Sequence, residues 1–219
     1  MCYNEQVSIS VFVVGTIFNL LLLFTFIHIP IVVALAIFLQ FVVMVQLVEG
    51  FAWLGYHETT SSMILCLTTL QPVVLALLLF YVPETHYWGK VIIGLLIVIY
   101  LMWLVYSLNN SPNFKSLEPG ECGHLDYSFW KNIGSVPYFI LAFFAILLIQ
   151  PADIGLVVLI TLLITLFLSS FLYTCKNETP SLWCLFSVIT PIVLYCYLRY
   201  RGFQSGLEEL SDFYKSGDY

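Results

Sequence analysis

Long apolar runs, separated by short polar or proline-containing breaks, dominate the chain. Crossing the hydrocarbon core of a bilayer takes about 20 apolar helical residues, and seven stretches meet that length. These stretches are Val7–Phe26, Pro30–Trp53, Ser62–Val82, Trp88–Leu108, Phe129–Ile149, Asp153–Thr174 and Pro180–Tyr200. Lipid offers no partners to backbone polar groups, so the stretches are expected to be helices, and the alternating pattern of a membrane barrel is absent. The pattern predicts an all-α fold, a seven-transmembrane helix bundle.

The bundle is expected to form one domain, residues 1–201, and to be followed by an acidic cytoplasmic tail, residues 202–219. Pro72, Pro137 and Pro191 fall inside predicted spans, where proline kinks a helix and frees a carbonyl. Such kinks either open room for a ligand or are merely tolerated in the packing, and the pattern leaves both readings open.

Composition excludes a soluble globule. Hydrophobic residues make up 61% of the chain and charged residues 9%, whereas soluble domains carry about 25% charged residues. The lipid bilayer is therefore the expected partner. Seven Lys and Arg residues form no basic stripe, so a nucleic-acid partner is not expected. The first apolar run, Val7–Phe26, has no basic residue before it and is predicted to be a span rather than a signal peptide.

Basic residues suggest an orientation. Arg199 and Arg201 adjoin the last predicted span, which places the tail in the cytoplasm and, after seven crossings, the N-terminus outside. Three lysines fall on the outer side of this arrangement and count against it: Lys115, Lys131 and Lys176. Five of the six cysteines also fall on the outer side, namely Cys2, Cys66, Cys122, Cys175 and Cys184. Cys66 and Cys184 are expected to be small buried residues, whereas some disulfide pairing is expected among the other three.

The carboxylate of Glu49 lies inside the second predicted span. A charge is costly in hydrocarbon, so an ionisable residue there indicates a functional site. Gln46, Glu49 and Trp53 are spaced to share one helix face, which is expected to turn toward the bundle interior. Gln71 is expected either to bond the carbonyl that Pro72 frees or to bond Gln46 across the helices. Further polar candidates for the interior are Asn19 and Gln40.

Three roles stay open for Glu49. It could be a neutral carboxyl that holds helices together, a binding group for a cation or proton, or a metal ligand or general base. The sequence contains neither an HExxH nor a CxxC pattern, and Cys122-Gly-His124 is too short for a usual zinc pair. Neither a metal nor a cofactor is therefore predicted.

Several short motifs resemble those of one family. They are Met1-Cys2-Tyr3-Asn4, Gln46-Leu47-Val48-Glu49 with Trp53, Gln71-Pro72, and Ser181-Leu182-Trp183-Cys184. The chain resembles small multi-span proteins of bacteria, protists and large DNA viruses that begin Met-Cys-Trp-Ser and carry Gln-Leu-Ile/Val-Glu-x-x-x-Trp and Ser-Leu-Trp-Cys segments. Tyr3 and Asn4 depart from that beginning, which puts a role for these two side chains in doubt. The resemblance implies shared architecture and supplies no reaction.

The predicted ligand-binding set is Glu49, Gln46, Trp53, Gln71, Trp183, Cys184 and Cys2. The leading hypothesis is a multi-pass sensor or transporter of a small molecule or ion, with a polar cavity at the outer leaflet centred on Glu49. One alternative is a membrane-embedded enzyme that uses Glu49 with Cys2 or Cys184, with or without a metal. The other is a structural membrane protein, of a virion for example, in which polar residues only hold helices together.

Overall fold

The computed structural model describes residues 4–83, 85–110, 125, 135–172 and 188–216. Seven α-helices account for most of these residues, which confirms the all-α fold class. They are α1 (Glu5–Thr25), α2 (Pro30–Trp53), α3 (His57–Tyr81), α4 (Tyr87–Asn110), α6 (Ser135–Leu147), α7 (Ala152–Leu172) and α9 (Ile189–Ser216).

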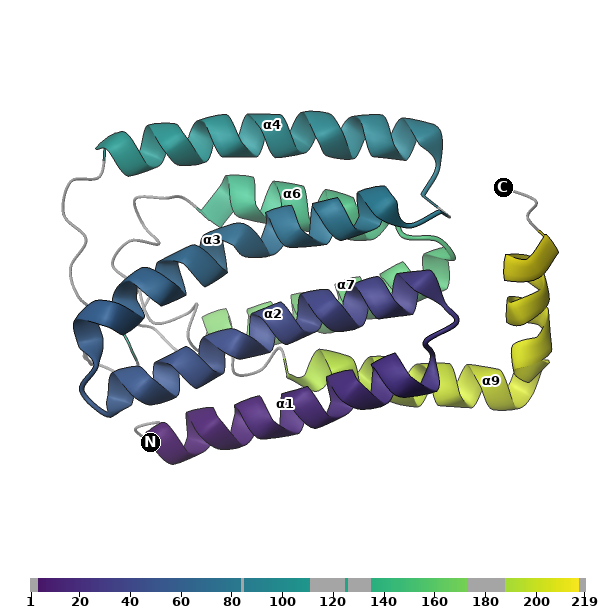
Figure 1. Ribbon diagram of the computed structural model, residues 1–219, viewed down its shortest axis with the longest axis horizontal. Helices are drawn as coiled ribbons and strands as arrows, with labels where there is room; N and C mark the ends of the chain where they lie inside the picture. Colours follow the sequence, from purple (N-terminus) through teal and green to yellow (C-terminus); the bar gives the residue numbers. More distant parts are fainter. Residues whose placement is uncertain (1–3, 84, 111–124, 126–134, 173–187, 217–219) are drawn as a thin grey trace.

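The helices lie alongside one another, with consecutive ones running in opposite directions (Figure 1). Helix α2 packs against α1 on one side and α3 on the other, while α3 also packs against α4 and α6. Helix α7 joins α6 to α9, and α9 returns to α1. The centre of this arrangement is α2. In its most apolar segment 67% of the residues are buried, compared with 22% in the corresponding segments of α1 and α4. The residues on α2 are therefore the ones most strongly screened from the surroundings.

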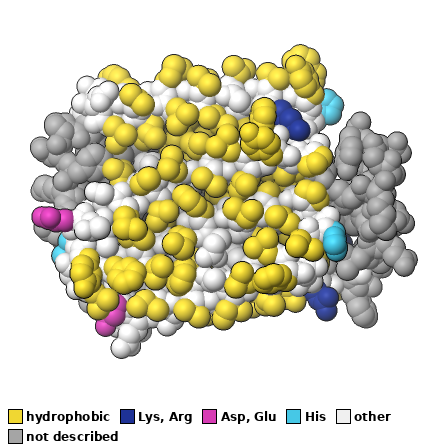
Figure 2. Space-filling model, in the orientation of Figure 1, with side chains coloured by type: hydrophobic (Ala, Val, Ile, Leu, Met, Phe, Trp, Pro, Cys, Tyr) yellow, Lys and Arg dark blue, Asp and Glu magenta, His cyan; other side chains and the backbone are white. Residues whose placement is uncertain are grey.

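Among the residues that the structure describes, five helices are long and apolar enough to cross a membrane. They are α1, α2, α3, α4 and the part of α7 from Ala152 to Phe171. Figure 2 shows hydrophobic side chains covering the surface between the two ends, with Lys and Arg at one end and Asp and Glu at the other. The chain therefore has the helices of an integral membrane protein, while its seven crossings stay a prediction.

The two ends of the bundle differ in charge. Three basic side chains are described, Lys90, Arg199 and Arg201, and all lie at the end where α3 ends and α4 begins, which we call the basic end (Figures 1 and 2). Acidic residues begin helices at the opposite, N-terminal end: Glu5 lies in the first turn of α1 and Glu58 in the first turn of α3. Apart from the buried Glu49, the charged side chains that the structure describes thus lie at the two ends, where a bilayer's headgroups would be.

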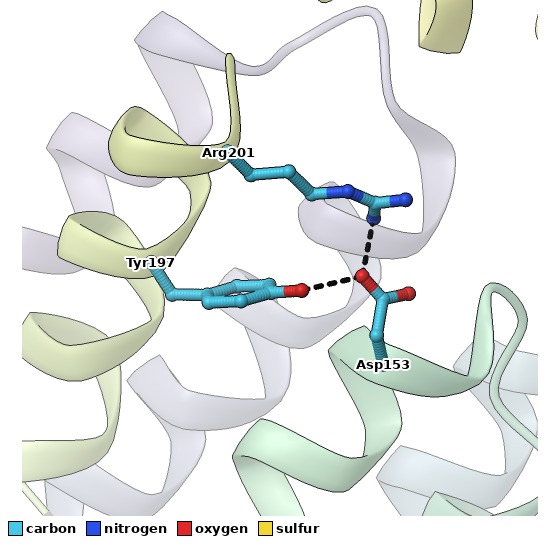
Figure 3. Close-up of polar contacts among 3 residues, drawn as sticks. All are labelled: Asp153, Tyr197 and Arg201. Carbon is cyan, nitrogen blue, oxygen red and sulfur yellow. Dashed lines mark hydrogen bonds and ion pairs between the residues drawn. The ribbon is translucent and has the colours of Figure 1, made fainter. Parts of the chain in front are cut away.

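An ion pair and a hydrogen bond join α7 to α9 at the basic end. Asp153, in the first turn of α7, accepts a hydrogen bond from the Tyr197 hydroxyl at 2.5 Å and pairs with Arg201 at 2.6 Å (Figure 3). Tyr197 and Arg201 are one helical turn apart, so both reach the same carboxylate. The two charged side chains remain about one-third exposed (31% and 37%), so the pair positions the helix ends more than it stabilises the fold.

Helix boundaries differ from the predicted spans where polar residues adjoin apolar ones. Helix α2 has the predicted bounds, Pro30–Trp53. Helix α3 begins at His57 rather than Ser62, because polar residues extend its first turn beyond the apolar run. Helix α9 continues to Ser216 through residues predicted to form a tail, and its ribbon changes direction beyond the bundle (Figure 1).

Only one of three predicted proline kinks lies in the interior of a described helix. Pro72 is inside α3, as expected. Pro191 instead falls in the first turn of α9 (Ile189–Ser216), which follows a turn at Val188, so the kink predicted there is wrong. Pro137 is the third described residue of α6 (Ser135–Leu147), and because the residues before Ser135 lie outside the described ones, the kink at Pro137 stays a prediction. A first turn tolerates proline because its backbone N–H groups have no partner within the helix.

Helix α1 packs tightly against its neighbours at Gly15. A Cβ atom built there would lie 2.7 Å from the Cγ2 atoms of both Val43 in α2 and Val188 beside α9. Valine has a stiff χ1 angle, so neither methyl can move aside cheaply. A glycine at this position thus allows α1 to pack closely against both Val43 and Val188.

We predict that Gly15→Ala lowers the free energy of unfolding by about 1–3 kcal/mol, because the added methyl overpacks the contact with Val43 and Val188. The matched control is Gly94→Ala in α4, where an added Cβ meets nothing within 4 Å and should be neutral or mildly stabilising. Unfolding of both variants can be followed by circular dichroism in mild detergent. Equal stability of the two variants would contradict the close packing at Gly15.

Candidate functional site

Glu49 is buried inside the bundle beside an amide. Both Glu49 and Gln46 are 1% exposed, and the Gln46 Nε2 group donates a hydrogen bond to Glu49 Oε2 at 2.6 Å. The two residues are one turn apart on α2, so the helix itself sets their geometry. The predicted inward-facing polar face of α2 is confirmed for these two side chains, whereas Trp53 is only half-buried.

The first turns of α1 cover the C-terminal end of α2 next to this pair. A Cβ added to Gly50 would lie 3.0 Å from Ile9 and 3.8 Å from the backbone oxygen of Glu5. Glu49 lies four residues before the last residue of α2, Trp53, a depth of about 6 Å at 1.5 Å per residue. The carboxyl is therefore near the N-terminal end of the bundle, one turn inside it.

The three described basic side chains lie at the other end. Lys90 is near the start of α4, while Arg199 and Arg201 follow the apolar part of α9. One donor to the Glu49 carboxyl is a neutral amide on the same helix. A carboxyl in such surroundings is most stable as the neutral acid or beside a cation, because hydrocarbon does not solvate a bare charge. The site is chemically suited to exchanging a proton or holding a cation.

Gln71 bonds neither of its predicted partners. Its Oε1 atom accepts a hydrogen bond from the hydroxyl of Tyr138 in α6 at 2.6 Å, and its Nε2 atom is buried without a protein partner. Gln46 is engaged with Glu49 instead. Because α6 packs directly against α3, its tyrosine reaches Gln71, and the predicted Gln46–Gln71 bond is wrong.

A second set of polar contacts joins α1 to α2. Asn19 Nδ2 donates to Gln40 Oε1 at 3.0 Å, and Gln40 Nε2 donates to Thr16 Oγ1 at 3.1 Å. Asn19 is buried, as expected. Gln40 was a candidate to extend the face formed by Gln46, but it turns to α1 instead. Tyr138 and Thr16 were missed by the sequence analysis, although a tyrosine in the middle of an apolar run is a signal that could have identified Tyr138.

Part of the predicted site lies outside the described residues. This is so for Cys2, Trp183 and Cys184, and for Cys122 and Cys175, whose disulfide pairing stays a prediction. Cys66 is exposed on α3, so its predicted burial is wrong. A thiol is weakly polar and behaves as a small apolar group, and it can therefore face lipid as readily as protein.

Within the described residues, no group of three or more His, Cys, Asp and Glu side chains is placed to hold a metal ion. No protein-family model matches the sequence, and no match was found among curated proteins or among solved structures. The resemblance to the Met-Cys-Trp-Ser family therefore stays a prediction, and function has to be argued from the residues themselves.

We predict that Gln46→Leu lowers the free energy of unfolding by about 1–2 kcal/mol, because the buried Glu49 carboxyl loses its amide donor. The Glu49→Leu background supplies the control. There the same Gln46→Leu change should be nearly neutral, since both polar partners are then replaced by apolar groups. Denaturation in mixed micelles measures all three variants. A Gln46→Leu effect of equal size in both backgrounds would show that the contact has no energetic importance.

Proposed function

We propose that the chain is an integral membrane transporter or sensor that binds a small molecule or ion at a polar site centred on Glu49. The observation that carries the proposal is the burial of this carboxyl, 1% exposed, against the amide of Gln46 in the central helix of an apolar bundle. A buried acid destabilises the bundle unless its charge is compensated. Its presence in this position therefore indicates a functional role.

Chemistry supports a cationic or proton-exchanging role. Glu49 accepts a hydrogen bond from a neutral amide, and binding a proton or a cation would neutralise this buried carboxyl. Gln46 can help to orient a bound ligand, because its amide is held one helical turn from Glu49. Trp53, half-buried on the same helix, supplies an aromatic face that suits an organic cation.

The depth of the site supports access from the side of the bundle where α1 begins. Glu49 lies one turn inside that end, whereas Gln40 and Gln71 each lie 10 residues from the basic end of their helices, a depth of about 15 Å. Because the hydrocarbon core is about 30 Å thick, these two amides lie near its middle. In this proposal the N-terminal end faces outside, in keeping with Arg199 and Arg201 at the cytoplasmic end.

We predict that Glu49→Gln abolishes ion or small-cation movement in proteoliposomes, because the amide keeps the shape of the side chain but cannot bind a proton or carry charge. The probe is an entrapped pH-sensitive dye, read under imposed gradients of H⁺, Na⁺, K⁺ and tetramethylammonium. Binding without transport, as in a sensor, is read as thermal stabilisation by the same ions.

The matched control is Glu58→Gln, which removes an exposed carboxylate at the same end of the bundle and should behave like the parent chain. Glu49→Ala separates loss of charge from loss of shape. If Glu49→Gln and Glu49→Ala both match the parent in flux and in ion-dependent stability, Glu49 serves only to hold helices together and the proposal fails.

A further inference from the structure

A buried polar contact in the middle of the bundle joins α3 to α6, away from Glu49. Gln71 is 2% exposed and Tyr138 3% exposed, and the Tyr138 hydroxyl donates to Gln71 Oε1 at 2.6 Å. From α4, the buried Tyr100 donates its hydroxyl to the backbone oxygen of Thr69 at 2.8 Å. Two neighbouring helices, α4 and α6, therefore direct hydroxyl groups at a single turn of α3.

One polar atom of Gln71 has no partner in the protein. Its Nε2 group is fully shielded and makes no hydrogen bond within the described residues. Exchanging the amide oxygen and nitrogen would not remove the problem, since Tyr138 would then bond Nε2 and leave Oε1 unpaired. In either orientation the side chain lacks one partner, and an unsatisfied buried amide is destabilising.

The same turn of α3 also lacks a donor. Pro72 has no backbone N–H, so the Thr68 carbonyl does not receive the hydrogen bond that the regular helix would give it. Helical side chains lean toward the N-terminus, which brings the Gln71 amide over the turn containing Thr68. The same turn of α3 therefore contains an amide that lacks one partner and a carbonyl that lacks its helical donor.

We propose that Gln71 and the Thr68 carbonyl hold a water molecule in the notch that Pro72 makes in α3. The water accepts a hydrogen bond from Gln71 Nε2 and donates one to the Thr68 oxygen, and with the hydroxyl of Tyr138 nearby it has the two to four polar partners that buried waters have. The ligand of this site is neutral water, so the inference is independent of the role proposed for Glu49.

The bound water would make the turn at Pro72 a hinge between the two halves of α3. Water replaces the backbone bond that proline removes, and it can break and remake its contacts as the halves of the helix move. The hydrogen bonds of Tyr100 from α4 and Tyr138 from α6 then hold this hinge in place.

Hydroxyl-radical footprinting of the full chain in lipid nanodiscs tests the proposal, because radicals formed from water by a short X-ray pulse oxidise the side chains that water touches. Mass spectrometry should show oxidation of Tyr138 despite its burial, well above that of Phe38, an equally buried ring on α2. Gln71→Leu should reduce the oxidation of Tyr138 to the Phe38 level. Pro72→Ala, which restores the missing N–H and leaves Gln71 in place, should reduce it as well.

The matched control is Gln40→Leu, which removes an amide at similar depth on α2 and should leave Tyr138 oxidation unchanged. If Gln71→Leu fails to fold, Pro72→Ala decides alone. Oxidation of Tyr138 no higher than that of Phe38 in the parent chain would overturn the proposal. So would oxidation that stays at the parent level in the folded Gln71→Leu and Pro72→Ala variants.

Discussion

Hydrocarbon provides no hydrogen-bond partners, so the polar side chains inside this bundle depend on partners from the protein or on buried water. The central helix shows the constraint most clearly, because Gln46 on α2 donates to the buried Glu49 one turn away. Hydroxyl groups meet the constraint within their own helices, as Thr68 does by donating to the Ile64 carbonyl. Longer amides need neighbours, and Gln71 finds Tyr138 on α6.

Helix α2 owes its importance to its position. It lies between α1 and α3, and it presents amides on two sides, Gln40 toward α1 and Gln46 beside Glu49. Most side chains of this helix are buried, so its acid is screened by neighbouring helices although it lies only one turn inside the N-terminal end of the bundle. The functional proposal depends on that burial, since an exposed carboxyl such as that of Glu58 would simply be solvated.

The sequence was sufficient for the existence of the helices and for the inward face of α2, because uninterrupted apolar runs and i, i+3 spacing are local properties. The bounds of α2 were exact because Pro30 begins the helix and the apolar run continues to Trp53. The partner of Gln71 was not predictable: Tyr138 is 67 residues away in sequence, and periodicity assigns a face without saying which helix covers it. The start of α3 was misplaced because the helix begins in polar residues that precede the apolar run.

The division between self-contained and shared hydrogen bonds has a consequence for biogenesis. On α7, Thr161 and Ser169 donate to carbonyls of their own helix, so this segment can leave the translocon for lipid as an independent rod. Helices α3 and α6 cannot satisfy Gln71 until they meet. A helix such as α7 can therefore insert before it packs, whereas α3 and α6 have to pack together before Gln71 has its partner. Helices of the latter type would depend longest on chaperones during biogenesis.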